Sequence, residues 1–180
     1  MRSRNILAPF RLAAGLLASC STPPPADPVA VGTASDQLKP LGAPVPADFV
    51  HRTVYVSVYS SIYLGIPSGS VRASLAATVS IRNISPEHPM IVTSARYFDS
   101  TGKEFRNYVT SPSILGRMAT AEFVVKRDSN LGGPGANFLV DWWGPADMDD
   151  PIIEAVMIGQ NGTASYSFTS VGRTLRRPAP

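Results

Sequence analysis

Few residues of this chain could do catalytic or metal chemistry. The 180 residues include two histidines, His51 and His88, and a single cysteine, Cys20. The sequence has no Gly-x-Ser-x-Gly, His-Glu-x-x-His or phosphate-loop pattern, so the usual nucleophilic, zinc and nucleotide sites lack their parts. Neither histidine has a recognisable partner, and a loop histidine exposed to solvent is the simpler interpretation of His88. We therefore expect no catalytic residue, no metal and no cofactor.

Two loop motifs match ligand sites only in part. Asp147, Asp149 and Asp150 are spaced roughly as in a calcium loop, but no turning glycine and no distal glutamate follow in register. The Gly-Gly-Pro-Gly run at residues 132–135 lacks the lysine and the helix that complete a phosphate loop. A solvated loop and a plain strand connection are the better interpretations.

The remaining carboxylates leave two interpretations open. Glu154 lies in an otherwise apolar run and would be costly to bury alone, so we predict a polar network in which it pairs with Arg96 or Arg82. The alternative is an enzyme, an envelope hydrolase that uses the carboxylates of Glu154, Asp141 and Asp99. Converging carboxylates in a deep pocket would favour the enzyme.

The elements that must position these side chains are short strands. In residues 72–82, apolar side chains alternate with small or polar ones, the period of a sheet with one wet face. Strand patterns occur at residues 53–59, 72–82, 91–98, 104–109, 120–126, 136–143, 152–158 and 164–170. A helix starting after Asp150-Pro151 is an alternative for residues 152–158.

Turn signals between these segments support the same architecture. Residues 99–102 have the pattern of a hairpin loop, and Asn161-Gly162 matches a type I′ turn. Short strands at this spacing predict an all-β fold, an antiparallel immunoglobulin-like β-sandwich of about 7–8 strands.

Aromatic residues give the clearest indication of a contact surface. Alternation along residues 53–59 and 136–143 places Tyr55, Tyr59, Trp143 and Asn137 opposite the valines and other apolar residues of the same strands. If that face is outward, these four residues form a contact patch, since tyrosine and tryptophan combine a rigid apolar body with a polar tip. Alternatively, the rings cover sheet edges or a second layer of the core.

The N-terminus has the pattern of an export signal. Arg2 and Arg4 precede a largely apolar stretch at residues 6–17, and Leu17-Ala18-Ser19-Cys20 resembles the lipobox of bacterial lipoproteins. That resemblance implies cleavage of residues 1–19 and acylation of Cys20. The alternatives are a secreted signal with an unrelated cysteine, or a membrane helix, for which the stretch is short.

The folded domain should be flanked by unstructured chain. Residues 20–48 are rich in proline and free of aromatic residues, which predicts a lipidated, extended tether before a domain at residues 49–172. Residues 173–180 are expected to form a disordered basic tail. Since three of the 16 basic residues and none of the 13 acidic ones precede Cys20, the cleaved chain would be neutral. A neutral chain gives no electrostatic reason to bind nucleic acid.

Several blocks together resemble a known family. The runs VYVSVYSSIYLG (54–65), LAATVSIRNISPEHPMIVTSARYFDSTGKEFRNY (75–108), AEFVV (121–125), GGPGANFLVDW (132–142) and IIEAVMIG (152–159) are similar to an uncharacterised family of bacterial exported proteins, domain of unknown function 3124. The resemblance covers nearly the whole predicted domain and implies no activity.

These observations favour a lipid-anchored protein of the bacterial cell envelope, facing the periplasm or the outside. We expect a non-catalytic binding or assembly module that contacts the membrane through its lipid and binds an envelope protein or polysaccharide. The sequence leaves open which membrane holds the anchor and the oligomeric state.

Overall fold

A computed structural model of the chain describes residues 36–64, 71–127 and 132–175, which belong to one compact unit. Within these residues there are twelve strands and no helix. The strands are β1 (Leu38–Pro40), β2 (Val50–Ser57), β3 (Ser61–Leu64), β4 (Val71–Arg82), β5 (Met90–Phe98), β6 (Glu104–Asn107), β7 (Ser113–Leu115), β8 (Thr120–Val125), β9 (Asn137–Gly144), β10 (Ile152–Asn161), β11 (Ala164–Val171) and β12 (Arg173–Thr174). The all-β prediction is confirmed, and β10 is a strand and not a helix.

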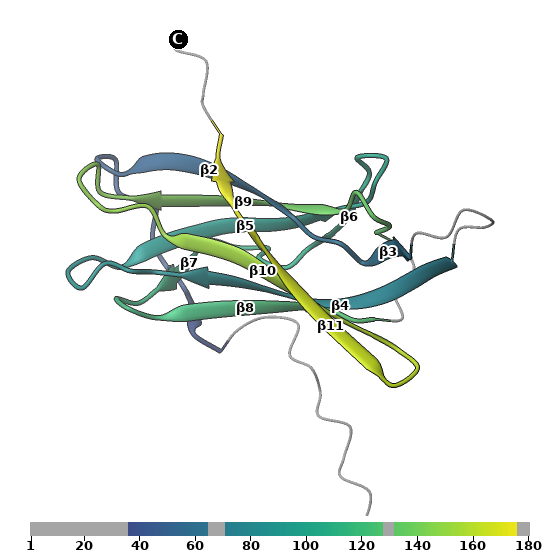
Figure 1. Cartoon of the computed structure of the whole chain (residues 1–180). Coiled ribbons are helices and arrows are strands. Elements are labelled where there is room, and N and C mark those ends of the chain that lie inside the picture. Colours follow the sequence, from purple (N-terminus) through teal and green to yellow (C-terminus); the bar gives the residue numbers. More distant parts are fainter. Residues whose placement is uncertain (1–35, 65–70, 128–131, 176–180) are drawn as a thin grey trace, which may run out of the picture. The chain divides into compact units, whose positions relative to one another are not determined.

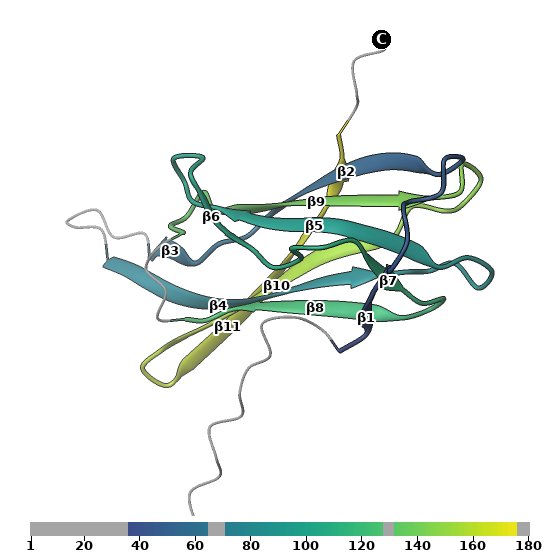
Figure 2. The ribbon, with the colours of Figure 1, turned by 180° about the vertical axis from the view of Figure 1, so that it is seen from behind.

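The strands form two antiparallel sheets that face each other as a sandwich (Figures 1 and 2). The first sheet has the order β1-β7-β5-β9-β2-β12, with β6 also paired to β5. The second sheet has the order β11-β10-β4-β3, with β8 also paired to β4. The structure has more strands than the predicted 7–8 because four strands of only two to four residues, β1, β3, β7 and β12, were not predicted.

The core lies between the two sheets and follows the alternation seen in the sequence. Along β4, Leu75, Ala77, Val79 and Ile81 are all 0% exposed. Opposing side chains come from the first sheet, where Trp142 of β9 is also 0% exposed. Removing each large apolar side chain from water contributes about 1.5–3 kcal/mol, so a continuous core of this kind can hold the sandwich together.

Both ends of the folded part extend beyond the predicted limits of residues 49 and 172. In β1, Leu38 pairs with Leu115 of β7, and the Leu41 N–H donates to Pro112 O at 2.9 Å. At the other end, Arg173 of β12 pairs with Tyr55 of β2. Residues 38–40 and 173–174 therefore belong to the first sheet, and not to a tether or a disordered tail.

The predicted anchor and most of the predicted tether, including Cys20 and residues 1–19, lie outside the described residues. Among those that are described, no helix has the length and apolar character needed to cross a membrane.

The predicted hairpins are present, with one change of turn type. Gly102 lies at φ 82° between β5 and β6, and its N–H donates to Asp99 O at 3.0 Å. At the β10–β11 hairpin, Asn161 pairs with Ala164, so the two loop residues are Gly162 and Thr163. Only Gly162 has a positive φ, 59°, which fits a type II′ turn. The prediction of a type I′ turn at Asn161-Gly162 is therefore wrong, because Asn161 still belongs to the β10–β11 ladder and the turn begins one residue later.

Candidate functional site

The outward face of the first sheet gathers polar side chains at its centre, where β9 lies between β2 and β5. Asp141 of β9 pairs with Thr53 of β2 on one side and with Ser94 of β5 on the other. The register between β5 and β9 shifts between Val92 and Ser94, so that Thr93 is an extra residue. Such a bulge changes which side chains share a face, and here it places Ser94 opposite Asp141 while Val92 stays buried.

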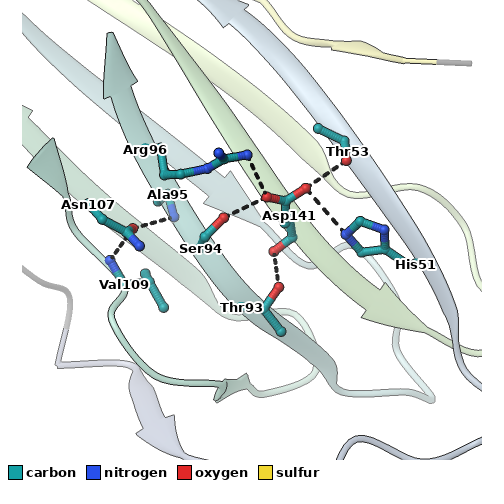
Figure 3. Close-up of polar contacts among 9 residues, drawn as sticks. All are labelled: His51, Thr53, Thr93, Ser94, Ala95, Arg96, Asn107, Val109 and Asp141. Carbon is teal, nitrogen blue, oxygen red and sulfur yellow. Dashed lines mark hydrogen bonds and ion pairs between the residues drawn. The ribbon is translucent and has the colours of Figure 1, made fainter. Parts of the chain in front are cut away.

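The Asp141 carboxylate accepts hydrogen bonds on both oxygens (Figure 3). Oδ1 is 2.6 Å from Thr53 Oγ1 and 3.2 Å from His51 Nε2. Oδ2 is 2.6 Å from Ser94 Oγ and 3.1 Å from an Arg96 guanidinium nitrogen. The Asp141 carbonyl oxygen also accepts from Thr93 Oγ1 at 3.2 Å. We call this group the Asp141 cluster: His51, Thr53, Thr93, Ser94, Arg96 and Asp141.

These contacts hold the cluster in one arrangement. The side chains of Asp141 and His51 are 16% and 17% exposed, and that of Arg96 is 33% exposed. Three donors, from Thr53, Ser94 and Arg96, bond the two carboxylate oxygens, and His51 Nε2 lies beside Oδ1, so little of the acceptor capacity is left for another group. Hydrogen bonds to a charged acceptor are stronger than neutral ones. The carboxylate is therefore occupied by its own neighbours, which suits an organising role better than proton transfer or nucleophilic attack.

The backbone beside the cluster is fixed as well. Asn107 of β6 lies next to Arg96, and its Oδ1 accepts from the backbone N–H groups of Ala95 at 3.1 Å and Val109 at 3.2 Å (Figure 3). Arg96 also lies over the Phe98 ring, with its guanidinium carbon 5.7 Å from the ring centroid. The Arg96 guanidinium group thus contacts both a carboxylate and an aromatic ring.

Three residues of the predicted contact patch lie on this outward face. Trp143 pairs with His51 across the strands, and their ring centroids are 4.9 Å apart. Tyr55 is 36% exposed, and Asn137 begins β9 on the same side as Asp141. The structure thus places Tyr55, Asn137 and Trp143 around the Asp141 cluster.

Tyr59 does not join them. The β2 ladder ends at Ser57, and Tyr59 follows it, partly buried against the core. Its ring centroid is 5.6 Å from that of Phe168 of β11, which belongs to the second sheet. The strict alternation that grouped Tyr59 with Tyr55 holds only while the chain stays in a regular strand.

The predicted polar network is divided between the two sheets. Arg82 Nε lies 3.1 Å from Glu154 Oε1 on the second sheet, where the two side chains are 43% and 26% exposed. Arg96 lies on the first sheet and bonds Asp141 instead. Glu154 therefore has one of its two predicted partners, and Arg96 belongs to the Asp141 cluster.

The three carboxylates of the hydrolase alternative do not converge. Asp141 is on the first sheet, Glu154 is on the second, and Asp99 lies in the β5–β6 hairpin loop. The Asp99 carboxylate accepts from the Thr101 hydroxyl at 2.7 Å and the Lys103 N–H at 3.0 Å. These bonds, with the Thr101 hydroxyl first, hold the pKa of Asp99 below its ordinary 3.8.

The other residues considered for chemistry have ordinary surroundings. The His88 side chain is 40% exposed, with Glu87 as its ionic neighbour at 3.9 Å. Asp150 accepts from Arg52 Nε at 3.3 Å and from the Thr174 hydroxyl at 3.0 Å. No three histidine, cysteine, aspartate or glutamate side chains lie close enough to hold a metal ion anywhere in the described part of the chain.

Sequence reasoning missed most of the Asp141 cluster. It found no recognisable partner for His51 and attached no role to Thr53, Thr93 or Ser94. Polar side chains at outward positions of β2 and β9 were a usable signal, because they lie opposite each other once the register is known. The bulge at Thr93 has no evident sequence signal.

Comparison with known proteins gives one match. A family model described as "Protein of unknown function (DUF3124)" matches residues 51–175, a range that contains every member of the Asp141 cluster. Neither the curated proteins nor the solved structures include a match to this chain.

Proposed function

This chain belongs to the DUF3124 family of proteins of unknown function, and we propose that its domain is a non-catalytic binding module. Its contact surface is the outward face of the first sheet, with Tyr55, Trp143 and Arg96 as the principal contact residues. The observation that carries this proposal is the Asp141 cluster, in which one carboxylate fixes donors from two neighbouring strands on a face turned away from the core.

Fixed side chains favour binding because less conformational freedom is lost when a partner docks. Ordering a long side chain at an interface costs about 0.5–1.5 kcal/mol, and the Asp141 carboxylate and Phe98 ring already restrict Arg96. The conformational freedom of the Trp143 side chain is likewise reduced, by the contact between its ring and the His51 ring. Tyrosine, tryptophan and arginine are also the residue types that contribute most to binding energy at protein interfaces.

The proposed partner is another protein of the cell envelope. The face is the surface of a sheet, and it combines the opposite charges of Asp141 and Arg96 with aromatic rings that are only partly exposed. A protein surface can match such a flat, mixed surface, because protein interfaces combine aromatic and arginine side chains with polar and charged ones at the rim. Binding to a cell-wall polymer is the alternative outcome of the test.

Alanine substitutions of aromatic residues on the two sheets test the proposed contact face. Full-length protein carrying Tyr55→Ala or Trp143→Ala should lose partner capture from solubilised membranes by roughly tenfold or more, as expected for central contact residues. Tyr63→Ala is the control, because Tyr63 is 53% exposed on β3 of the second sheet. Equal capture by all three variants would refute the proposed face. Sedimentation with purified peptidoglycan that depends on Tyr55 and Trp143 would instead identify a polymer as the ligand.

We also propose that Cys20 carries a lipid that keeps the domain at a bacterial membrane, a proposal supported by the Leu17-Ala18-Ser19-Cys20 motif. Cys20→Ser should release the protein into the soluble fraction, whereas Ser21→Ala, one residue later, should leave it in the membrane fraction. A Cys20→Ser protein that still sediments with membranes would refute the lipid anchor.

A further inference from the structure

The β11 strand has a free edge along its whole length. It pairs with β10 through eight consecutive residue pairs, from Glu154 with Val171 to Asn161 with Ala164, without a register shift. It is also the last strand in the order of the second sheet. No backbone group of residues 164–171 takes part in the additional hydrogen bonds found between described residues. Half of its backbone donors and acceptors therefore point away from the sheet, and none of them has a backbone partner among the residues that the structure describes.

This edge differs from the other sheet edges of the described structure. The edge strands β1, β3, β6 and β12 have three, four, four and two residues. The longer edge strand β8 has six residues and carries Glu122. By contrast, β11 has eight residues, Ala-Ser-Tyr-Ser-Phe-Thr-Ser-Val, with no charge, proline or glycine. Proteins normally protect a free edge by shortness, charge, proline or a bulge, and β11 uses none of these.

The outward face of β11 has a hollow at one end and a projecting side chain at the other. Near the β10–β11 turn, a shallow hollow of about 230 Å³ is lined by Ile158, Ser165, Tyr166 and Ser167. Val171, at the opposite end, is 71% exposed. Residues 165, 167 and 171 share one face because side chains alternate along a strand. A hollow and an apolar projection on the same face of one strand can complement each other in two antiparallel copies.

We propose that two copies of this chain associate by antiparallel pairing of their β11 strands, in a register centred on Phe168. In that register Val171 of each copy lies opposite Ser165 of the other and fills the second copy's hollow. The two Phe168 side chains lie opposite each other on the inward side, where aromatic cross-strand pairs are favourable. The contact is symmetric, so the same hydrogen bonds and the same Val171 insertion occur twice.

The absence of charge on β11 suits a second copy in particular. Any charged residue near the centre of a symmetric strand pair would face or adjoin its own like charge, which is destabilising. The outward residues Ser165, Ser167 and Thr169 are small and neutral, so they impose no such cost. The hairpin also projects past neighbouring strands in Figure 1, which leaves its edge accessible. This pairing uses the second sheet and is independent of the binding face proposed on the first.

Sedimentation of the full chain tests the association. With Cys20→Ser in all proteins to remove the native thiol, the parent should form a dimer at concentrations of roughly 1–100 µM, a range that covers micromolar dissociation constants. Val171→Lys should raise the dissociation constant roughly tenfold or more, because an ammonium group loses hydration in an apolar hollow. Val50→Lys is the matched control, since Val50 is 40% exposed on the first sheet, and its dimer should be unchanged.

Cysteine cross-linking tests the register independently of affinity. Ser165→Cys combined with Val171→Cys should form a disulfide between two chains under mild oxidation, whereas either substitution alone should not. A bond within one chain is excluded, because six residues of strand span about 20 Å. A monomeric parent over the whole range would overturn the proposal, and so would a dimer that Val171→Lys leaves intact or a double variant that does not cross-link.

Discussion

Asp141→Asn should destabilise the domain because it breaks the centre of the Asp141 cluster. The amide keeps one oxygen as an acceptor but turns an NH2 group toward two donors. Either hydroxyl can rotate to accept from that NH2 group, so the change mainly removes the negative charge that strengthens the two short bonds from Thr53 and Ser94, both at 2.6 Å. Hydrogen bonds to charged groups contribute about 1.5–3 kcal/mol. The pair with Arg96 adds only about 0–1 kcal/mol, because that side chain is 33% exposed.

These contributions give an expected loss of about 2 kcal/mol in the free energy of unfolding. Urea denaturation followed by circular dichroism measures it, as a lower midpoint with an unchanged slope. Glu154→Gln is the matched control, because Glu154 pairs only with Arg82 among the described charged residues and that arginine is 43% exposed. Its expected loss is about 0.5 kcal/mol or less.

A double-mutant cycle identifies the cause of the loss. Ser94→Ala and Asp141→Asn should be non-additive, since both disrupt the hydrogen bond between their side chains. Losses that are equal for Asp141→Asn and Glu154→Gln would refute the central role of the carboxylate. Strict additivity of the two substitutions in the cluster would refute the direct bond.

Three further predictions concern packing and titration. Gly132→Ala should destabilise the fold by about 1–3 kcal/mol in urea melts, because the added Cβ would overlap the Tyr97 hydroxyl and lie 2.8 Å from the Ala136 Cβ. Gly116→Ala, whose Cβ would have its nearest contact at 3.9 Å, should change stability little. An NMR titration should place the pKa of Asp99 below its ordinary 3.8, and Thr101→Val should move that pKa back toward 3.8. Because the folded pKa is the lower one, the contribution of Asp99 to stability is present above pH 3.8 and is lost as pH falls through the folded pKa. Burial raises the pKa of Tyr97 above 10.0, so the unfolded chain releases the phenol proton at a lower pH than the folded protein. The contribution of Tyr97 to stability is therefore fully present below pH 10.0 and is lost as pH rises through the folded pKa. Tyr97→Phe should make the loss of stability with pH shallower in urea melts between about pH 8 and 11.

Much of the fold could be predicted from the sequence because a strand's side chains alternate with a fixed period. The alternation in residues 72–82 identified the buried face of β4, and the same rule placed Trp142 inward and Trp143 outward on β9. Glycine at position 102 marked a tight turn, because only glycine adopts a positive φ at no steric cost. These are local properties, and each can be read within a few residues.

Other elements depended on a neighbour that local sequence does not identify. β1 and β12 have three and two residues, too few for a period to be visible, and they are strands because the edges of β7 and β2 bind them. The position of Tyr59 depended on where β2 leaves the ladder, which placed this ring against Phe168.

The sequence by itself determined the all-β class, the positions of eight of the twelve described strands, most of the inward residues and the presence of Asp141 on an outward strand face. Only the tertiary structure decided which residues surround that carboxylate. His51, Ser94 and Arg96 come from strands that are distant in sequence, and their meeting depends on the register of β2, β9 and β5 and on the extra residue at Thr93. A shift of one residue turns every side chain of a strand to the opposite face, and register is set by packing of the whole sheet. The site is therefore a product of long-range pairing, which the order of residues along the chain does not display.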